Sequence, residues 1–334
     1  MFKDLTKICE ILRQHNNFLV VSHAMPDGDA IGSQLGMAQI LKYLDKNFRL
    51  YNISGMPDAL TWINPGFKIA REVKELGDFK PEVCIFVDCG DEYRAGQEIY
   101  ELLAEGAFPL SICIDHHRGN PEFATVNLID PTASAAAYLV AQVAKELGIL
   151  LDGQLGKFIY LGLVEDTGSF SYANTDAKTL ALAAEIVDLG LNVGQFNTCR
   201  ENTWSLERFH FWGKLSNAVQ FAHANTIVYV CVSHAMLDEA GLTVADLSDF
   251  ASWMRRIRNT KVCAMIREHG PGRIKVSLRS AIKVNVQKVA VHFGGGGHFN
   301  AAAMEIDGDL ENAVNLVMPL LAKEIDLAEE SICD

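Results

Sequence analysis

Residues 110–117 read LSICIDHH, an apolar run from Leu110 to Ile114 that ends in one aspartate and two histidines. A short apolar run bounded by polar residues is typical of a buried strand. In an open α/β sheet, ligands gather outside the carboxyl ends of the strands. Asp115, His116 and His117 therefore indicate a ligand site at a strand end.

Three other apolar segments are followed by the same kinds of side chain. Residues 18–21 precede His23, Asp27 and Asp29, residues 83–87 precede Asp88, and residues 159–164 precede Asp166. Each aspartate taken alone is as readily explained as a turn or helix-capping residue. Four predicted strand ends that all carry such side chains indicate a metal site.

The size and charge of the chain limit its fold and its partners. The chain has 334 residues, a hydrophobic fraction of 49% and a formal net charge of −13. This length and composition predict two domains, each with its own core. The acidic charge disfavours long duplex or extended single-stranded nucleic acid, because such partners require a basic surface. A small anionic substrate remains compatible with the composition.

The cysteines and the apolar runs indicate the cellular setting. The eight cysteines are scattered and form no Cys-x-x-Cys pair, which disfavours a zinc ribbon or a disulfide framework. The N-terminus lacks an apolar signal core. Apolar runs fall short of the roughly 18 to 20 residues of a membrane span. We therefore expect a cytoplasmic protein with no membrane partner.

The order of elements predicts an α/β fold in two domains. Residues 1–190 alternate strand-like and helical patterns, which is typical of a mainly parallel sheet flanked by helices. Residues 191–220 carry polar and aromatic residues at helical spacing and are expected to form a linker helix. Residues 221–334 are expected to form a smaller α/β domain with a mixed sheet, including a hairpin around Gly270-Pro271-Gly272.

The donor types favour particular ions. Histidine and aspartate without cysteine suit Mn²⁺ first, with Mg²⁺ or Co²⁺ as substitutes. The candidate ligands offer more donor atoms than one ion needs, so two Mn²⁺ ions are expected, about 3.5–4 Å apart, with a bridging hydroxide. Hydrolysis of a phosphate ester is the natural reaction of such a pair. The candidate ligands are His23, Asp27, Asp29, Asp88, His116 and Asp166.

The segment after His23 is expected to form a turn and then a helix. Gly28 would let the chain turn tightly, so that Asp27 and Asp29 face one point. Residues 30–33 would open a helix whose N-terminus favours an anion. Ser33 is therefore a candidate substrate-binding residue.

These motifs resemble those of the DHH phosphoesterase superfamily. The resemblance rests on Asp88, on Asp115-His116-His117, on Asp166-Thr167-Gly168, and on His23, Pro26, Asp27, Gly28, Asp29, Ala30, Gly32 and Ser33. Residues 293–298, FGGGGH, resemble the glycine-rich signature of the associated C-terminal domain. The length and residues 277–280, SLRS, resemble the branch of nanoRNases that also act on 3′-phosphoadenosine 5′-phosphate (pAp).

The resemblance implies a role for each metal-site residue. His23, Asp27 and Asp88 would hold the first ion, and Asp29, Asp88, His116 and Asp166 the second, with Asp88 bridging the two. Asp115 would orient an imidazole. His117 would face the substrate, as a phosphate contact or as the proton donor to the leaving oxygen. His117, Asp88 and Asp115 are thus the expected catalytic residues.

The resemblance also implies a substrate-binding C-terminal domain, with the active-site cleft between the two domains. Arg279 would hold the far phosphate of the substrate with a bidentate fork. Gly295, Gly296 and Gly297 would offer backbone N–H groups to that phosphate, and His298 would bind it too. Three positions depart from the family pattern: Ala303 replaces glycine, Tyr138 replaces glutamate, and Glu165 replaces threonine.

The expected activity is metal-dependent hydrolysis of short single-stranded oligoribonucleotides (nanoRNA), of pAp, or of both, to mononucleotides, AMP and phosphate. Two other enzyme classes remain open: a phosphodiesterase for cyclic or linear dinucleotides, and a pyrophosphatase or exopolyphosphatase with the same metal site. A regulatory nucleotide-binding module is the alternative outside enzymes. The sequence leaves the oligomeric state open, including a homodimer.

Overall fold

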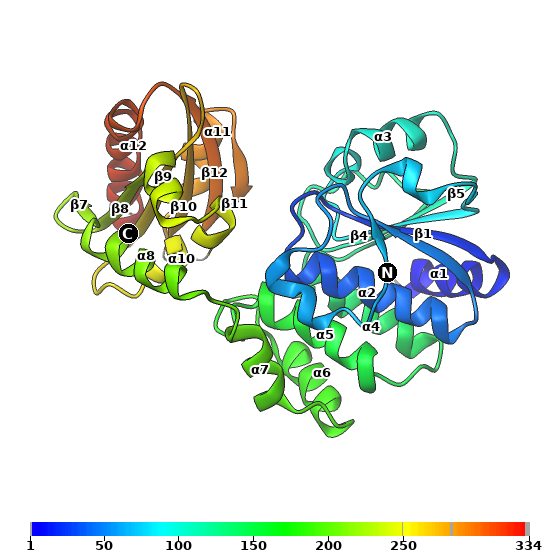
Figure 1. The fold of residues 1–334 in the computed structure, drawn as a ribbon. Coiled ribbons are helices and arrows are strands. Elements are labelled where there is room, and N and C mark those ends of the chain that lie inside the picture. Colours follow the sequence, from blue (N-terminus) through cyan, green and yellow to red (C-terminus); the bar gives the residue numbers. More distant parts are fainter. Residues whose placement is uncertain (1, 249, 281–282, 331–334) are drawn as a thin grey trace. The chain divides into compact units, whose positions relative to one another are not determined.

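The computed structural model of the protein describes residues 2–248, 250–280 and 283–330. The chain forms two compact units, the first ending at Thr203 and the second beginning at Trp204 (Figure 1). Each unit has a six-stranded sheet and its own buried apolar core. The structure therefore has the two-domain α/β class that the sequence predicts.

The first sheet consists of parallel strands in the order β3-β2-β1-β4-β5-β6. This is the order of a doubly wound sheet, in which the direction of progress reverses between β1 and β4. The carboxyl ends of β1, β4 and β5 thus lie side by side where such sheets bind ligands. The strands are β1 (Asn17–Ser22), β2 (Asn47–Tyr51), β3 (Ile69–Ala70), β4 (Val83–Val87), β5 (Leu110–Asp115) and β6 (Val126–Ile129).

Helices cover both faces of this sheet. Figure 1 shows α2, α4 and α5 on one face and α3 on the other. The helices of this unit are α1 (Phe2–Gln14), α2 (Gly28–Tyr43), α3 (Gln97–Ala104), α4 (Ala136–Glu146), α5 (Gly153–Asp166), α6 (Ala177–Asp188) and α7 (Val193–Glu201). Three short 3₁₀ turns, η1 (Asp58–Ile63), η2 (Val73–Leu76) and η3 (Glu92–Ala95), complete the unit.

One predicted strand is a helix. Residues 159–164, expected as a strand before Asp166, lie within α5. This helix packs against α2, α4 and α6 and is buried on most sides, so its sequence lacks the polar face of an amphipathic helix. A short apolar run cannot by itself distinguish such a helix from a buried strand. Asp166 is therefore the last residue of a helix.

The segment 191–220, expected as one linker helix, contains two helices. α7 belongs to the first unit and α8 (Leu206–Asn217) to the second. The hydroxyl of Ser205 accepts a hydrogen bond from the N–H of Arg208 and caps the start of α8. The boundary between the units, after Thr203, falls inside this segment.

The second unit is built on a mixed sheet in the order β11-β12-β10-β9-β8-β7. Strands β8 and β9 are parallel, and the other neighbours are antiparallel. The predicted hairpin is present as β9 and β10. The strands are β7 (Gln220–Ala222), β8 (Ile227–Val232), β9 (Val262–Gly270), β10 (Arg273–Ser280), β11 (Gly296–His298) and β12 (Ala301–Asp307).

The two faces of the second sheet have different helical cover. One face packs against α11 (Val286–His292) and α12 (Leu310–Glu330). The other face is covered at β8 and β9 by α8, α9 (His234–Ala240), α10 (Phe250–Met254) and the 3₁₀ turn η4 (Val244–Leu247). Along β10, buried residues alternate with partly exposed ones, and Arg279 is on the partly exposed side. Across the described residues, no helix is long and apolar enough to cross a bilayer.

Helices α2 and α5 approach each other through glycines. A Cβ atom on Gly32 would lie 2.5 Å from the carbonyl oxygen of Phe158. A Cβ atom on Gly162 would lie 2.4 Å from Oδ1 of Asp29. Since a backbone oxygen cannot move aside without its helix, these contacts fix α5 against the helix that carries Asp29.

We predict that Gly32→Ala lowers the free energy of unfolding by about 1–3 kcal/mol, because the added methyl group overpacks the contact with α5. Urea denaturation measures this change. Gly36→Ala in the same helix is the matched control, since its Cβ would meet only side chains, at 3.3 Å. Removal of a helical glycine is favourable by roughly 0.5–1 kcal/mol, so Gly36→Ala should be close to neutral. Equal destabilisation by the two variants would contradict the close backbone contact.

Candidate metal centre

The predicted metal ligands lie together in the first unit. His23, Asp88 and His116 follow the ends of β1, β4 and β5, and Asp166 ends α5. The structure forms three groups whose ligand atoms lie within 4.8 Å of one another: His23, Asp27 and Asp88; Asp29, His116 and Asp166; and Asp88, His116 and His117. The first group contains the residues expected for the first ion. The second contains those expected for the second ion except Asp88, which lies in the other two groups.

Backbone carbonyls orient two of the histidines. Nδ1 of His23 lies 2.9 Å from the carbonyl oxygen of Ala24, and Nδ1 of His116 lies 3.2 Å from that of Ala133. A Nδ1–H donor in each bond leaves Nε2 as the free ligand atom. Nε2 of His116 lies 3.1 Å from Oδ2 of Asp166. Both imidazoles are therefore arranged as metal ligands that bind through Nε2.

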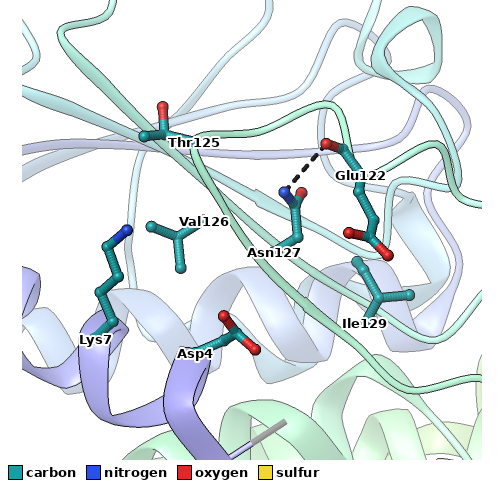
Figure 2. A pocket seen from close by; sticks show the side chains of 7 residues that line it. All are labelled: Asp4, Lys7, Glu122, Thr125, Val126, Asn127 and Ile129. Atoms are coloured by element: carbon teal, nitrogen blue, oxygen red, sulfur yellow. Dashed lines mark hydrogen bonds between the residues drawn. The ribbon is translucent and has the colours of Figure 1, made fainter.

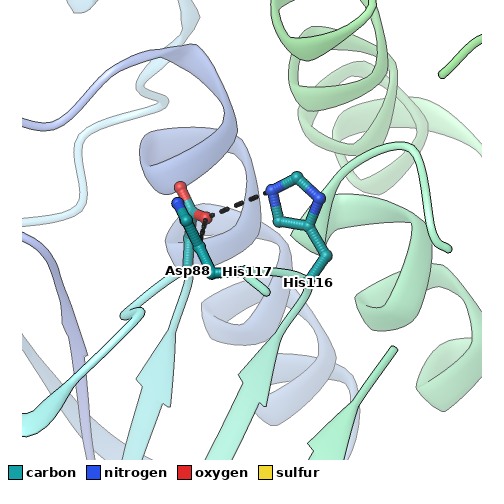
Figure 3. Close-up of side chains that lie close together, drawn as sticks. All are labelled: Asp88, His116 and His117. Atoms are coloured by element: carbon teal, nitrogen blue, oxygen red, sulfur yellow. Dashed lines mark ion pairs between the residues drawn. The ribbon is translucent and has the colours of Figure 1, made fainter. Parts of the chain in front are cut away.

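Asp88 lies at the centre of the cluster. Its Oδ2 is 3.4 Å from Nε2 of His23, whereas its Oδ1 is 3.7 Å from Nε2 of His116 and 3.5 Å from Nδ1 of His117. Figure 3 shows Asp88 directed toward both His116 and His117. Oδ1 is buried and accepts no hydrogen bond from the described residues. One carboxylate oxygen toward each group fits a bridging ligand, and an orphaned buried oxygen fits a bound cation.

The two aspartates around Gly28 have additional structural partners. Oδ1 of Asp27 accepts hydrogen bonds from the N–H groups of Asp29 and Ala30 and thereby caps α2. Asp29 is fully buried, and its two oxygens accept hydrogen bonds from the N–H groups of Ala136 and Ala137 at the start of α4. Each carboxylate thus joins a helix N-terminus to the metal centre.

Two expectations about this segment are corrected by the structure. The N–H groups of Asp29 and Ala30 in the first turn of α2 are already bonded to Asp27, so this helix start does not offer these two groups to a substrate anion. Ser33 is fully buried and its hydroxyl donates to Oδ1 of Asp29 at 3.3 Å. Ser33 therefore supports a candidate ligand and does not contact solvent, where a substrate would lie.

Gly28 is required for a different reason from the one we expected. Its φ is not positive, and it is the first residue of α2. A Cβ atom there would lie 2.0 Å from Cγ of Glu165. The glycine therefore makes room for the side chain of Glu165.

Burial, together with repulsion between neighbouring carboxylates, raises the pKa of two of the aspartates. Burial, reinforced by the charge of Asp29, raises the pKa of Asp88 well above its usual range. Burial and the charges of Asp29 and Asp27 do the same for the pKa of Asp166. Burial alone would lower the pKa of His23, but hydrogen bonds to Asp27 and Asp88 outweigh burial and raise it to about 10. Divalent ions would offset this repulsion and displace protons from the ligands that they bind.

His117 differs from His116 in its partner. Its Nδ1 lies 2.7 Å from Oδ1 of the fully buried Asp115. This bond orients the imidazole. The second ring nitrogen, Nε2, does not take part in it. Asp115 therefore orients His117, whereas a backbone carbonyl orients His116.

Sequence reasoning missed Asn120. Its side-chain N–H group donates to Oδ2 of Asp115 at 2.7 Å and to the carbonyl oxygen of Cys89 at 3.0 Å. Asn120 thus fixes the carboxylate that orients His117. In the sequence, an asparagine before Pro121 is an ordinary turn residue, so no local signal marks this role.

The turn after Asp166 has an uncommon backbone. Gly168, Ser169 and Phe170 have φ values of +55°, +58° and +62°. For a residue with a side chain this conformation costs on the order of 1–3 kcal/mol. The Thr167 hydroxyl donates to the carbonyl oxygen of Leu163 at 2.5 Å and accepts from the N–H of Phe170 at 2.9 Å. Local hydrogen bonds thus offset part of the strain beside a candidate ligand.

Three buried thiols belong to this part of the sheet: Cys89 follows Asp88, Cys113 lies two residues before Asp115, and Cys84 lies near the start of β4. Sγ of Cys113 lies 3.8 Å from the carbonyl oxygen of Cys89, the residue after Asp88. Burial raises the pKa of all three thiols well above the ordinary value. Among the described residues, the metal-binding groups contain no cysteine.

The residues expected to bind the far phosphate lie in the second unit. His298, Ala301 and Arg279 are directly opposite one another across β11, β12 and β10, so their side chains share one face of the sheet. The small side chain of Ala301 separates the two basic groups. The structure thus brings Arg279 and His298 onto one row.

The glycines before His298 allow strands to approach closely. A Cβ atom on Gly295 would lie 2.2 Å from the carbonyl oxygen of Ala303, and one on Gly297 would lie 2.5 Å from that of Ala301. Gly296 pairs with Ala303 in the sheet. The N–H of Gly295 bonds to the carbonyl oxygen of Ala290, so it is already occupied.

The departures at positions 303 and 138 are accommodated. Ala303 lies in β12 without a positive φ, so this position does not need the glycine that we expected there. Tyr138 is partly buried in α4 and packs against the core of the first unit.

A surface hollow of about 270 Å³ lies beside β6 and α1 (Figure 2). Its lining includes Asp4, Lys7, Glu122 and Asn127, and the side chain of Asn127 donates to the carbonyl oxygen of Glu122. None of the lining residues belongs to the metal-binding groups. The hollow and the metal-binding groups therefore have no residue in common.

Comparison with known proteins identifies both units. Residues 17–163 match the model of the DHH family, N-terminal domain, and residues 224–323 match that of the DHHA1 domain. The chain is 29% identical over 323 residues to the bifunctional oligoribonuclease and PAP phosphatase NrnA of Thermus thermophilus, with 96% of this chain and 94% of that protein covered.

Two further similarities bear on the fold and the substrate. A crystal structure of an exopolyphosphatase-related protein from Bacteroides fragilis superposes with a TM-score of 0.91 at 25% identity, covering 98% of each chain. The cyclic-di-AMP phosphodiesterase PdeA of Listeria monocytogenes is 25% identical, over 89% of this chain and 46% of that protein. With both family domains matched in order over most of its length, the chain belongs to the DHH phosphoesterase superfamily.

Proposed function

We propose that the protein is a Mn²⁺-dependent phosphoesterase that hydrolyses short oligoribonucleotides and pAp. The observation that carries this proposal is the position of Asp88, with one carboxylate oxygen toward His23 and the other toward His116. Such a shared carboxylate suits two ions at one centre. The donors are nitrogen and oxygen only, which suits Mn²⁺ and Mg²⁺ better than thiophilic ions.

The residues of the centre divide into two ion-binding sets. His23, Asp27 and Asp88 would hold one ion, and Asp29, Asp88, His116 and Asp166 the other. When bound, such ions lower the pKa of water and polarise phosphoryl oxygens. The protein holds the ligands in place through backbone carbonyls behind His23 and His116 and through the two helix starts bonded to Asp27 and Asp29.

His117 is proposed to act on the substrate. Asp115 holds Nδ1 of His117 at 2.7 Å, and Asn120 holds Asp115. An imidazole oriented in this way through Nδ1 would donate a proton to the leaving oxygen through Nε2. Asp115 would also stabilise the protonated imidazole, since the buried carboxylate bonds to it directly.

The substrate class is inferred from relatives and from the second unit. The Thermus relative covered almost end to end is named for oligoribonuclease and PAP phosphatase activity. Arg279 and His298 on one row would bind a phosphate remote from the scissile bond. The similarity to PdeA makes cyclic and linear dinucleotides the second candidate substrates.

A panel of substrates, each with Mn²⁺, decides among these candidates: pAp, di- to pentaribonucleotides, pyrophosphate, polyphosphate and cyclic dinucleotides. Turnover only of pyrophosphate, polyphosphate and cyclic dinucleotides would refute the proposal.

Asp88→Asn should reduce turnover by orders of magnitude and lower Mn²⁺ content, because it removes the proposed bridging charge. Asparagine is the suitable replacement, since Asp88 has φ of +54° and asparagine tolerates this backbone better than alanine. Kinetics at saturating Mn²⁺ and elemental analysis measure the two effects. Near-normal turnover by folded Asp88→Asn protein would refute a shared ligand.

His116→Ala and His117→Ala should differ in their effects. His116→Ala should lower bound Mn²⁺, because Nε2 of His116 faces the centre. His117→Ala should lower turnover with a much smaller loss of metal, because Nδ1 of His117 is bonded to Asp115. Bound manganese per chain, measured beside turnover, tests the difference. Equal metal loss in both variants would show that both histidines are ligands.

Arg279→Lys should weaken turnover of pAp and of 5′-phosphorylated dinucleotides roughly 10- to 150-fold, because it loses about 1.5–3 kcal/mol of charge-assisted hydrogen bonding. Turnover of p-nitrophenyl phosphate should change little, since this compound has no second phosphate. The ratio of kcat/KM values between substrates is the measurement. A uniform loss on all three substrates would contradict a role in binding a remote phosphate.

A further inference from the structure

Arg200 of α7 bonds to both ends of the turn that carries Asp166. Its Nη1 lies 3.3 Å from Oε1 of Glu165, the residue before Asp166. Its Nη2 donates to the hydroxyl of Ser169 at 3.2 Å, three residues after Asp166. A planar guanidinium holds its two Nη groups in a fixed fork that suits two such bonds at once, whereas an ammonium group donates from a single, flexibly held nitrogen. The fork therefore spans residues 165–169.

The helix that carries Arg200 is anchored to the core. Phe196, one helical turn earlier on the same side of α7, is buried. Its ring contacts Tyr160 of α5 edge to face, with centroids 5.0 Å apart, and Trp62 of η1 at 5.2 Å. The side chain of Arg200 is itself only 20% exposed. Arg200 thus projects from a fixed support and faces protein more than solvent.

Glu165 connects this fork to the other half of the centre. Its Cγ occupies the space where a Cβ of residue 28 would lie, so its stem packs directly on Gly28. Gly28 lies between Asp27 and Asp29, which belong to the first and the second ligand group respectively. The position of Glu165 therefore affects the distance between Asp166 and the Asp27–Asp29 segment.

We infer that Arg200 is a positioning residue for the second ion of the proposed two-ion centre, acting through Glu165 and Ser169 on Asp166. The inference rests on the proposed function, because it requires Asp29, His116 and Asp166 to hold an ion. The strained backbone at Ser169 and Phe170 needs outside support, and the bond from Arg200 to Ser169 supplies it. Glu165, the departure from threonine, is the residue through which α7 reaches the metal ligands.

Electrostatics and positioning predict opposite results for removal of Arg200. Loss of a nearby positive charge, by itself, strengthens the binding of a cation. Loss of the fork frees the turn and Asp166, which weakens binding of the second ion. A loss of affinity in Arg200→Met therefore reports geometry and not charge.

The experiment is a titration of metal-free full-length protein with Mn²⁺ in the absence of substrate, followed by calorimetry and by electron paramagnetic resonance. Wild type should bind two ions with a spin-coupled signal. Arg200→Met should bind the first ion as wild type does and the second ion about 10- to 100-fold more weakly. This is the usual loss when a residue that orients a metal ligand is replaced. Arg200→Lys should lie between them. Lys145→Met, which breaks the Lys145–Glu185 pair between α4 and α6, is the matched control and should bind as wild type does.

Glu165→Gln completes a double-mutant cycle with Arg200→Met. If Arg200 acts through Glu165, the double variant should lose no more affinity for the second ion than the single variant that binds this ion less tightly. Two unchanged or strengthened affinities in folded Arg200→Met protein, or equal weakening of both, would overturn the inference while leaving the two-ion proposal intact. A single ion in wild type would instead overturn the two-ion function, and the inference with it.

Discussion

The repulsion among aspartates that share one buried space is the constraint on which the first unit is built. Asp29 and Asp88 are almost completely removed from water, and burial raises the pKa of each. Such a cluster is stable only with compensating charge, from protons or from metal ions. The surrounding structure supplies what neutral groups can: helix starts at Asp27 and Asp29, and histidines fixed by backbone carbonyls. The doubly wound sheet brings these groups together because its strands end side by side.

Much of this centre could be predicted from the sequence, because the ligands follow apolar runs and strand ends meet at one edge of a parallel sheet. His23, Asp88 and His116 are examples, and the hairpin of β9 and β10 was equally evident from its glycine–proline turn. Features that depend on packing between distant segments could not be predicted from the sequence. The helix α5 was taken for a strand, since complete burial removes its helical periodicity. Ser33 was expected to bind the substrate, and only the packing of the folded domain shows that it is buried.

The roles of single residues show the same division. A glycine at position 28 was expected because of its backbone freedom. The structure gives a better reason, since the side chain of Glu165, far away in the sequence, occupies the space that a Cβ at position 28 would need. Asn120 resembles an ordinary turn residue until its side chain is seen on Asp115. Asp115 was expected to orient an imidazole because metal-bound histidines usually need such a partner, but it bonds to His117, whereas the carbonyl of Ala133 bonds to His116. Spacing in sequence locates ligands, but the residues that hold the ligands come from unrelated segments.

The buried thiols of Cys89 and Cys113 lie close to Asp88 and Asp115 in the chain, so their protonation matters to the chemistry of the centre. Cys89 follows Asp88 in the chain, yet burial raises the pKa of each thiol well above the ordinary value. This disfavours the thiolate, which is the form that binds metals and acts as a nucleophile. Thiophilic ions therefore find no thiolate there to bind. Peroxide, which attacks thiolates exposed to solvent, likewise has no ready target beside the ions. The burial of Cys89 and Cys113 therefore makes both thiols less reactive toward oxidants and metals than exposed cysteines would be.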